Sequence, residues 1–298
     1  MKKVLACAAI LVGSFSLAAN YNAQAEKDRL ALIKYYEKVF ADPAGKSSVY
    51  FPYTPEKELK EDYIKGIKWK DFVLGSYAYA KGPKEQYLEM IDFPPYLDNI
   101  DHGEELYNSN KALKECFPDP AKARAKYPMF DQKKKEVVTL TVAINDCLKS
   151  HGQKPWNMKK GDLADVEAYF AAQAKENGLK VNVQIPSKEA EDAYMRGRKY
   201  YYSQRGYLKL SCANCHVQGV GKRTRRDYLS PAVGQVAHFP VYRLAWQELG
   251  TLERRISGCL VNMGQKPVAP DSKQMRELIY FLSYMSNGLP YQGPDVRK

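Results

Sequence analysis

The chain of 298 residues is long enough for two domains of ordinary size, each with its own core. Apolar residues make up 45% and aromatic residues 12%, which excludes a disordered chain. The formal charge of +12 favours an anionic substrate or an acidic partner. Six cysteines are too few for a disulfide scaffold, so the place and pairing of each one carry the information.

Residues 1–25 have the pattern of an export signal. Two lysines precede an almost wholly apolar run, and Ala23-Gln24-Ala25 has small residues at the spacing of a cleavage site. The run is short for a membrane anchor, and a lipoprotein signal at Cys7 has weak support. We therefore expect cleavage after Ala25 and a periplasmic protein with charge +10, five cysteines and no nucleic-acid partner.

An internal repeat organises the rest of the sequence. Segments 127–155 and 239–267 align without a gap and share a proline, Thr-Leu, Cys-Leu and a final Gly-Gln-Lys-Pro in register. Chance similarity between two amphipathic helices would not reproduce that ending. Each copy closes with a predicted helix, over 163–174 and, after a capping Ser272, over 275–285. Alternation over 180–186 predicts an extended linker between two copies of one domain.

The second copy contains Cys212-Ala213-Asn214-Cys215-His216. Two thiols at this spacing can form thioethers to the two vinyl groups of one haem, and the following histidine then binds the iron as proximal ligand. A zinc site would need a second ligand pair at suitable spacing, and a thioredoxin-type dithiol would need an accompanying strand pattern. The sequence therefore predicts one covalently bound haem c.

The first copy lacks this motif. It reads Cys116-Phe117-Pro118-Asp119-Pro120, so that an aspartate replaces the second thiol and a proline replaces the iron ligand. We expect a mainly α protein with two tandem cytochrome c-like domains related by internal duplication: a haem-free domain over 26–180 and a haem-binding domain over 181–298. The surviving Cys116 and Cys147 would lie near one another around the vacated pocket, which predicts a disulfide in an exported protein.

Two of the five remaining cysteines are assigned to the haem and two to the disulfide, which leaves Cys259 without a partner. It occupies the position of Cys147 in the repeat. We expect its thiol to face the iron as distal ligand. Helical spacing places Arg255 one turn before it on the same face, where a cation favours the thiolate and can hold an anion. The alternative is an exposed Arg255 beside Arg254.

Other distal ligands remain open. A methionine is the usual ligand in electron-carrying c cytochromes, and a histidine precedes the repeated Phe-Pro segment. We expect two further histidines, in the haem-free half, to lie at the surface. The candidate ligands are Met263, Met275, Met285 and His238, and the surface histidines are His102 and His151.

Four segments together resemble the SoxA family, the catalytic c-type cytochrome subunits of the thiosulfate-oxidising SoxAX complex. They are 206–216, 239–246, 251–259 and 288–297. The motifs are specific in the second half and looser in the first, where many family members carry a second haem, so the chain resembles the single-haem branch. The resemblance implies that Cys259 is the distal haem ligand and active-site cysteine, often found as a persulfide, with Arg255 in the same pocket.

The resemblance also implies the reaction: thiosulfate is oxidatively joined to a cysteine of a SoxYZ-like carrier, and the electrons pass to a SoxX-like cytochrome in a heterodimer. Because one haem holds one electron and the reaction releases two, an outside acceptor is required. Two alternatives stay open. The protein would be a periplasmic monohaem electron carrier without transferase activity, or a structural partner with a vestigial haem.

Overall fold

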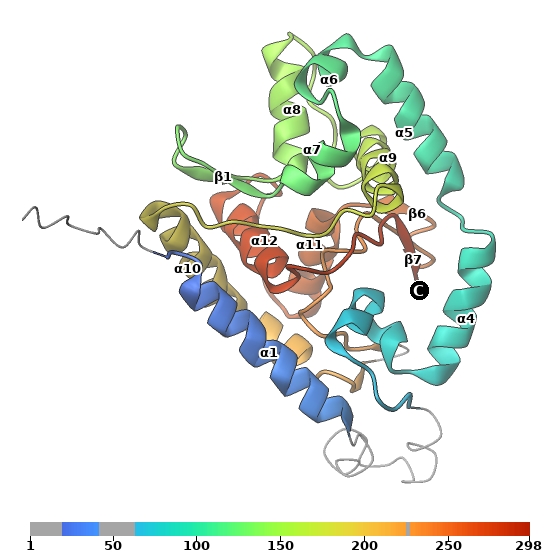
Figure 1. Ribbon diagram of the computed structural model, residues 1–298, viewed down its shortest axis with the longest axis vertical. Coiled ribbons are helices and arrows are strands. Elements are labelled where there is room, and N and C mark those ends of the chain that lie inside the picture. The colour runs from blue at the N-terminus through green and yellow to red at the C-terminus, as the bar shows by residue number, and fades with distance from the viewer. Residues whose placement is uncertain (1–19, 42–62, 225–226) are drawn as a thin grey trace, which may run out of the picture.

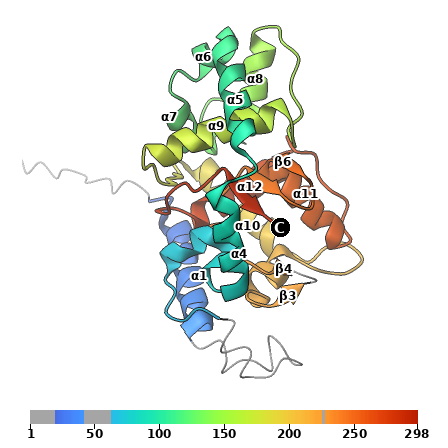
Figure 2. The same cartoon turned by 90° about the vertical axis from the view of Figure 1, so that its right-hand side faces the viewer.

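The computed structural model describes residues 20–41, 63–224 and 227–298. The molecule is mainly helical, as predicted, and has two lobes in Figure 2. The described helices that precede the repeat are α1 (Ala23–Ala41), the 3₁₀ segment η2 (Trp69–Ala78) and α4 (Lys81–Asp92). In the described part of the chain, no helix is both long and apolar enough to cross a membrane.

The upper lobe in Figure 2 contains the first copy of the repeat. Its elements are α5 (Leu97–Ser109), α6 (Lys111–Cys116), α7 (Pro120–Lys126), β1 (Met129–Asp131), β2 (Glu136–Val138), α8 (Leu140–Ser150) and α9 (Asp162–Glu176). Strands β1 and β2 form an antiparallel hairpin. Helix α9 packs against α5 and α7.

The second copy follows in the lower lobe, and its hairpin is again followed by two helices. Its elements are α10 (Lys188–Tyr202), the short helical turn η3 (Asn214–Gln218), β3 (Arg223–Thr224), β4 (Asp227–Tyr228), β5 (Val241–Arg243), β6 (Glu248–Gly250), α11 (Leu252–Asn262), α12 (Lys273–Met285) and β7 (Asp295–Arg297). Strand β5 pairs antiparallel with β6 and parallel with β7. Ser272 caps α12 by accepting a bond from the Met275 amide at 3.3 Å, as predicted.

The first and last helices of each copy cross at a glycine. A Cβ on Gly197 of α10 would overlap the backbone carbonyl of Glu277 in α12, and a Cβ on Gly103 of α5 would overlap that of Asp165 in α9. Each crossing also carries a salt bridge, Arg196–Glu277 at 2.7 Å and His102–Asp165 at 2.9 Å. Only a hydrogen atom fits between the backbones at these two positions.

The segments before α4 share a core mainly with the second copy, and this core also includes Phe130, Val137 and Ala174 of the first. Tyrosine hydroxyls from these segments donate to the loop after the haem motif: Tyr36 to the His216 carbonyl at 2.7 Å, Tyr63 to that of Gly221 at 2.6 Å and Tyr79 to that of Leu229 at 2.7 Å. The segments before α4 therefore pack against elements of both copies, and the predicted domain limits of 26–180 and 181–298 stay a prediction. The repeat alone carried no sign of this, because these segments lie outside it.

Residues on both sides of the predicted cleavage site belong to the fold. The Asn22 amide exchanges two hydrogen bonds with the Ile185 backbone, and Ala25 is fully buried. Cleavage after Ala25 would remove these contacts and the first turn of α1. The remainder of the predicted signal, 1–19, lies outside the described residues.

Buried polar groups connect the two lobes. The Thr141 hydroxyl of α8 donates to the Glu253 carboxylate of α11 at 2.6 Å. Burial and the negative charge of Glu253 raise the pKa of Glu167 to about 8, and burial raises the pKa of Glu253. The two carboxyl groups therefore retain protons in the folded protein at pH values where unfolded glutamates are ionised.

Substitution of two glycines by alanine tests the helix crossing. Gly197→Ala should lower the free energy of unfolding by about 1–3 kcal/mol or more, because the new Cβ overlaps a backbone carbonyl. Gly258→Ala in α11 is the matched control, since a Cβ there meets nothing within 4 Å. It should raise stability by about 1 kcal/mol through helix propensity. Equal effects in denaturant unfolding would contradict the crossing constraint.

The buried carboxyl pair predicts a pH-dependent stability. A folded-state pKa of about 8 means that the stabilising contribution of protonated Glu167 is complete below pH 4.5 and is lost as the pH rises through 8. Glu167→Gln should therefore stabilise the protein by up to a few kcal/mol at pH 9 and change little at pH 4. Glu176→Gln, at an exposed position of the same helix, should show no such pH dependence. Unfolding curves at the two pH values decide the question.

Candidate functional site

The predicted haem motif lies on a tight turn that starts after α10 and includes η3. The Asn214 side chain fixes this turn, because its oxygen accepts bonds from the Ser211 amide at 2.8 Å and the Ser211 hydroxyl at 2.9 Å. Cys212 and Cys215 are unpaired and half-buried. Two thiols and the following imidazole are thereby presented from one short, hydrogen-bonded segment.

The ring of His216 is held through one nitrogen. Nδ1 lies 2.8 Å from the backbone oxygen of Ser230 and 2.7 Å from the side-chain amide of Gln235. Because a carbonyl can only accept, Nδ1 carries the proton and donates to Ser230. Nε2 is then the ring nitrogen left to donate to the Cys259 thiolate or, once deprotonated, to bind a metal ion.

The thiol of Cys259 on α11 faces His216 in the interior. Burial opposes its ionisation, but the charge of Arg255, a hydrogen bond with the His216 ring and the charge of Arg243 together lower the thiol pKa to about 7. An ordinary cysteine has a pKa of about 8.5. The site therefore favours a thiolate at this position and surrounds it with cations suited to an anionic ligand.

The three unpaired thiols of the described chain lie in one cluster. Burial, and then the negative charge of Cys259, raise the pKa of Cys212 to about 12, and the same causes raise the pKa of Cys215. The cluster thus contains one thiol that ionises readily and two that stay protonated. The structure brings all five predicted residues of this half together: Cys212, Cys215, His216, Arg255 and Cys259.

The alternative ligands to Cys259 are all buried in the core. Met275 and Met285 are fully buried core residues of α12, and Met263 is 6% exposed in the same core. His238 is buried beside Phe239 and Gly75, and burial and Arg297 hold its pKa well below its usual range. Arg255 and Arg254 are both partly buried, so Arg255 is not the exposed surface residue of the alternative. Arg254 has other partners. Its guanidinium lies over the Trp246 ring and pairs with Glu248 at 2.7 Å.

In the first copy, the two cysteines at the positions of Cys212 and Cys259 are joined to each other. Cys116 and Cys147 form a disulfide, which confirms the predicted pairing. Asp119 accepts from the Lys122 amide at 3.0 Å and caps α7, whose first residue is Pro120. His151 lies near the two sulfurs, but it contacts the Cys147 carbonyl and Glu115. The residues that replace the haem motif therefore start a helix.

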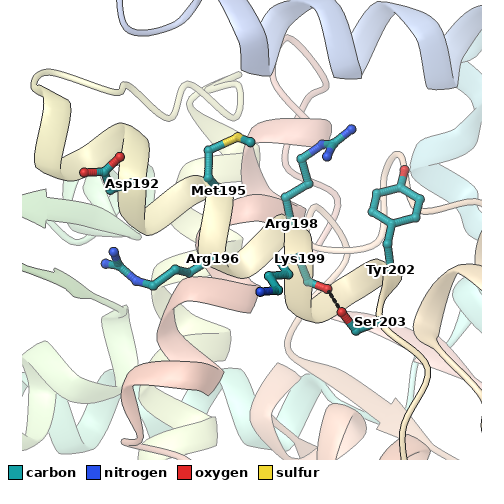
Figure 3. Close-up of a pocket in the computed structure, with 7 residues that line it drawn as sticks. All are labelled: Asp192, Met195, Arg196, Arg198, Lys199, Tyr202 and Ser203. Carbon is teal, nitrogen blue, oxygen red and sulfur yellow. Dashed lines mark hydrogen bonds between the residues drawn. The ribbon is translucent and has the colours of Figure 1, made fainter.

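A pocket on the outer face of α10 is separate from the thiol cluster. Figure 3 shows its side chains spread along the exposed face of this helix. Two of its cations are already paired, Arg196 with Glu277 and Arg198 with Asp28. The lining residues are Asp192, Met195, Arg196, Arg198, Lys199, Tyr202 and Ser203.

The donor set of the main site fits a covalently attached haem. Two unpaired thiols stand beside an imidazole whose Nδ1 is already engaged, and a low-pKa thiol faces that imidazole. Sequence reasoning missed Ser230, Gln235 and Arg243, which support the imidazole and the thiolate. None of them falls at a spacing that marks a ligand, and Ser230 acts through its backbone.

Comparisons with known proteins identify the family of the chain. The SoxA/TsdA cytochrome c domain matches residues 102–181 and 196–291. The protein named L-cysteine S-thiosulfotransferase subunit SoxA from Chlorobaculum tepidum is 46% identical over 78% of this chain and 82% of its own length. That of Chlorobaculum thiosulfatiphilum is 42% identical over 93% and 94%.

A solved structure of a related protein has a similar fold. The crystal structure of SoxXA from P. pantotrophus matches with a TM-score of 0.65 and 25% identity over 72% of this chain and 84% of that chain. The family match covers more than half of the sequence and includes the residues of the thiol cluster. The chain is therefore a member of the SoxA/TsdA cytochrome c family.

Proposed function

We propose that the chain acts as an L-cysteine S-thiosulfotransferase subunit, which joins thiosulfate oxidatively to a cysteine of a SoxYZ-like carrier protein. The carrying observation is the half-buried Cys259 thiol, whose pKa is lowered to about 7 by Arg255, Arg243 and the histidine of the haem motif. The names of the relatives in Chlorobaculum support the same activity. Thiosulfate is a dianion, and the cations around the thiol suit it.

One haem c is the proposed cofactor. Cys212 and Cys215 would form its thioethers, His216 would be the proximal ligand and Cys259 the distal one. When bound, the group supplies a one-electron redox centre beside the reacting sulfur. His216 is prepared for this role because Nδ1 donates to Ser230, which leaves Nε2, once deprotonated, as the nitrogen that binds the iron.

The chain's own residues account for substrate binding and bond formation. Arg255 and Arg243 hold the sulfonate end of thiosulfate, so that its terminal sulfur lies at the Cys259 thiolate. A sulfur–sulfur bond forms between them and two electrons leave, which gives Cys259–S–S–SO₃⁻. The carrier's cysteine thiolate then attacks the middle sulfur, which was the terminal sulfur of thiosulfate. The bond from that sulfur to Cys259 breaks, the carrier keeps the S–SO₃⁻ group, and Cys259 returns to its thiolate form.

The two electrons require an acceptor outside this chain, because one haem holds one. A SoxX-like cytochrome in a heterodimer is the proposed partner, and the solved relative titled SoxXA supports it. The periplasm is the proposed location, after cleavage of an N-terminal signal. The cleavage position after Ala25 stays a prediction.

We further propose that the protein consists of two tandem cytochrome c-like domains from an internal duplication, the first without haem. The matching hairpins, the helix caps by Thr139 and Thr251, and the two glycine crossings support this. The disulfide between Cys116 and Cys147 supports a haem-free first half. The predicted limits, 26–180 and 181–298, would then enclose the repeats, with the segments before α4 packed on the second.

The mass of the mature protein tests the cofactor and the cysteine assignment together. We expect one haem and two hydrogens fewer than the fully reduced chain, because Cys116 and Cys147 are joined. Alkylation of denatured, unreduced protein should then leave these two cysteines unlabelled. Two haem groups, or labelling at both cysteines, would contradict the assignment.

Two substitutions test the proposed chemistry. Cys259→Ala should abolish thiosulfate-dependent turnover with carrier protein, because the relay sulfur is lost. Arg255→Ala should lower kcat/KM by about 10- to 100-fold, since a hydrogen bond to a charged group contributes about 1.5–3 kcal/mol. Arg254→Ala is the control at the adjacent position and should change kcat/KM little. Full activity of the Cys259 variant would refute the proposed mechanism.

A further inference from the structure

The proximal imidazole has a second neighbour that the proposed function does not use. Besides the Ser230 carbonyl at 2.8 Å, the side-chain amide of Gln235 lies 2.7 Å from His216 Nδ1. The same amide group is 3.3 Å from the Ser230 hydroxyl. The Nδ1–H group of His216 therefore has both the Ser230 carbonyl and the Gln235 amide within hydrogen-bonding distance.

The chemistry of these groups fixes the orientation of the amide. With the nitrogen of Gln235 toward His216, two donors would face each other, because Nδ1 already carries the proton given to Ser230. Turning the amide by 180° exchanges its nitrogen and oxygen without moving any other atom. The oxygen then accepts from both the His216 N–H and the Ser230 hydroxyl, and no donor faces a donor.

The backbone around Gln235 is held firmly. The Gly234 amide donates to the Ser286 hydroxyl at 3.0 Å, and a Cβ on Gly234 would overlap the Phe72 carbonyl. Gly234 has φ +91°, which favours glycine. The Ala232 amide donates to the Tyr36 hydroxyl at 3.2 Å. The amide of Gln235 is thus delivered to the imidazole by a loop with little freedom to withdraw it.

We propose that Gln235 is a positioning residue for the haem, whose side-chain oxygen shares the His216 N–H with the Ser230 carbonyl and thereby lowers the reduction potential. Two acceptors withdraw the proton further from the ring than one does, so the imidazole becomes a stronger electron donor to iron. A more basic ligand stabilises the oxidised state. The inference rests on haem attachment through His216 and not on transferase activity.

The test is a spectroelectrochemical titration of the purified, haem-loaded protein with two variants of opposite expected sign. Gln235→Leu removes the second acceptor and should raise the ratio of reduced to oxidised haem about tenfold at the wild-type midpoint, which is 59 mV for one electron. Gln235→Glu supplies a stronger acceptor and should lower that ratio by a similar factor. Ser230→Ala keeps the carbonyl and should change the ratio less than Gln235→Leu does.

A general disturbance of the loop would shift the reduction potential of both Gln235 variants in the same direction. Shifts of equal sign, or no shift in either variant, would therefore overturn the inference even if both proteins carry haem. Unchanged low-spin absorption spectra are expected, because the iron ligands are retained. A wild-type protein without covalent haem would instead overturn the cofactor assignment of the proposed function, so the two failures are distinguishable.

Discussion

The structure depends on the contact of two helix backbones at a position where no side chain fits. In the second copy this contact joins α10 and α12 at Gly197, and its counterpart in the first copy joins α5 and α9 at Gly103. The helices α8 and α11 pack within the frames that these crossings define. Since α11 carries Cys259 and the haem motif follows α10, the crossing places the thiol opposite the imidazole.

The same fold supports different chemistry in its two halves through a few substitutions. Cys147 and Cys259 occupy equivalent positions on α8 and α11, yet one is tied into a disulfide and the other is a low-pKa thiol. Ala143 stands in the first half where Arg255 stands in the second. The first half thus lacks the cation and has its cysteine in a disulfide, while α8 keeps the length of α11.

Sequence reasoning reached the features that covalent chemistry or periodicity imposes. Spacing located the thiols of the haem motif, and subtraction over the repeat identified Cys259. It did not reach groups that act through the backbone or from a distant segment. Tyr36 contacts the loop after the haem motif across 180 positions of sequence, and Ser230 contributes only its carbonyl. No local pattern records such contacts, because they arise from the tertiary arrangement.

The interface between the lobes follows the rule of a symmetric dimer. Helix α12 contacts β2, and α9 contacts β6. Because α9 is the counterpart of α12 and β2 is the counterpart of β6, the same contact occurs twice with the copies exchanged. At the centre, the equivalent positions 141 and 253 touch one another. In a dimer of identical chains, a residue on the two-fold axis meets its own twin, so a glutamate there would face a glutamate. In this single chain the two positions carry different residues, and the Thr141 hydroxyl donates to the Glu253 carboxyl group where the lobes meet.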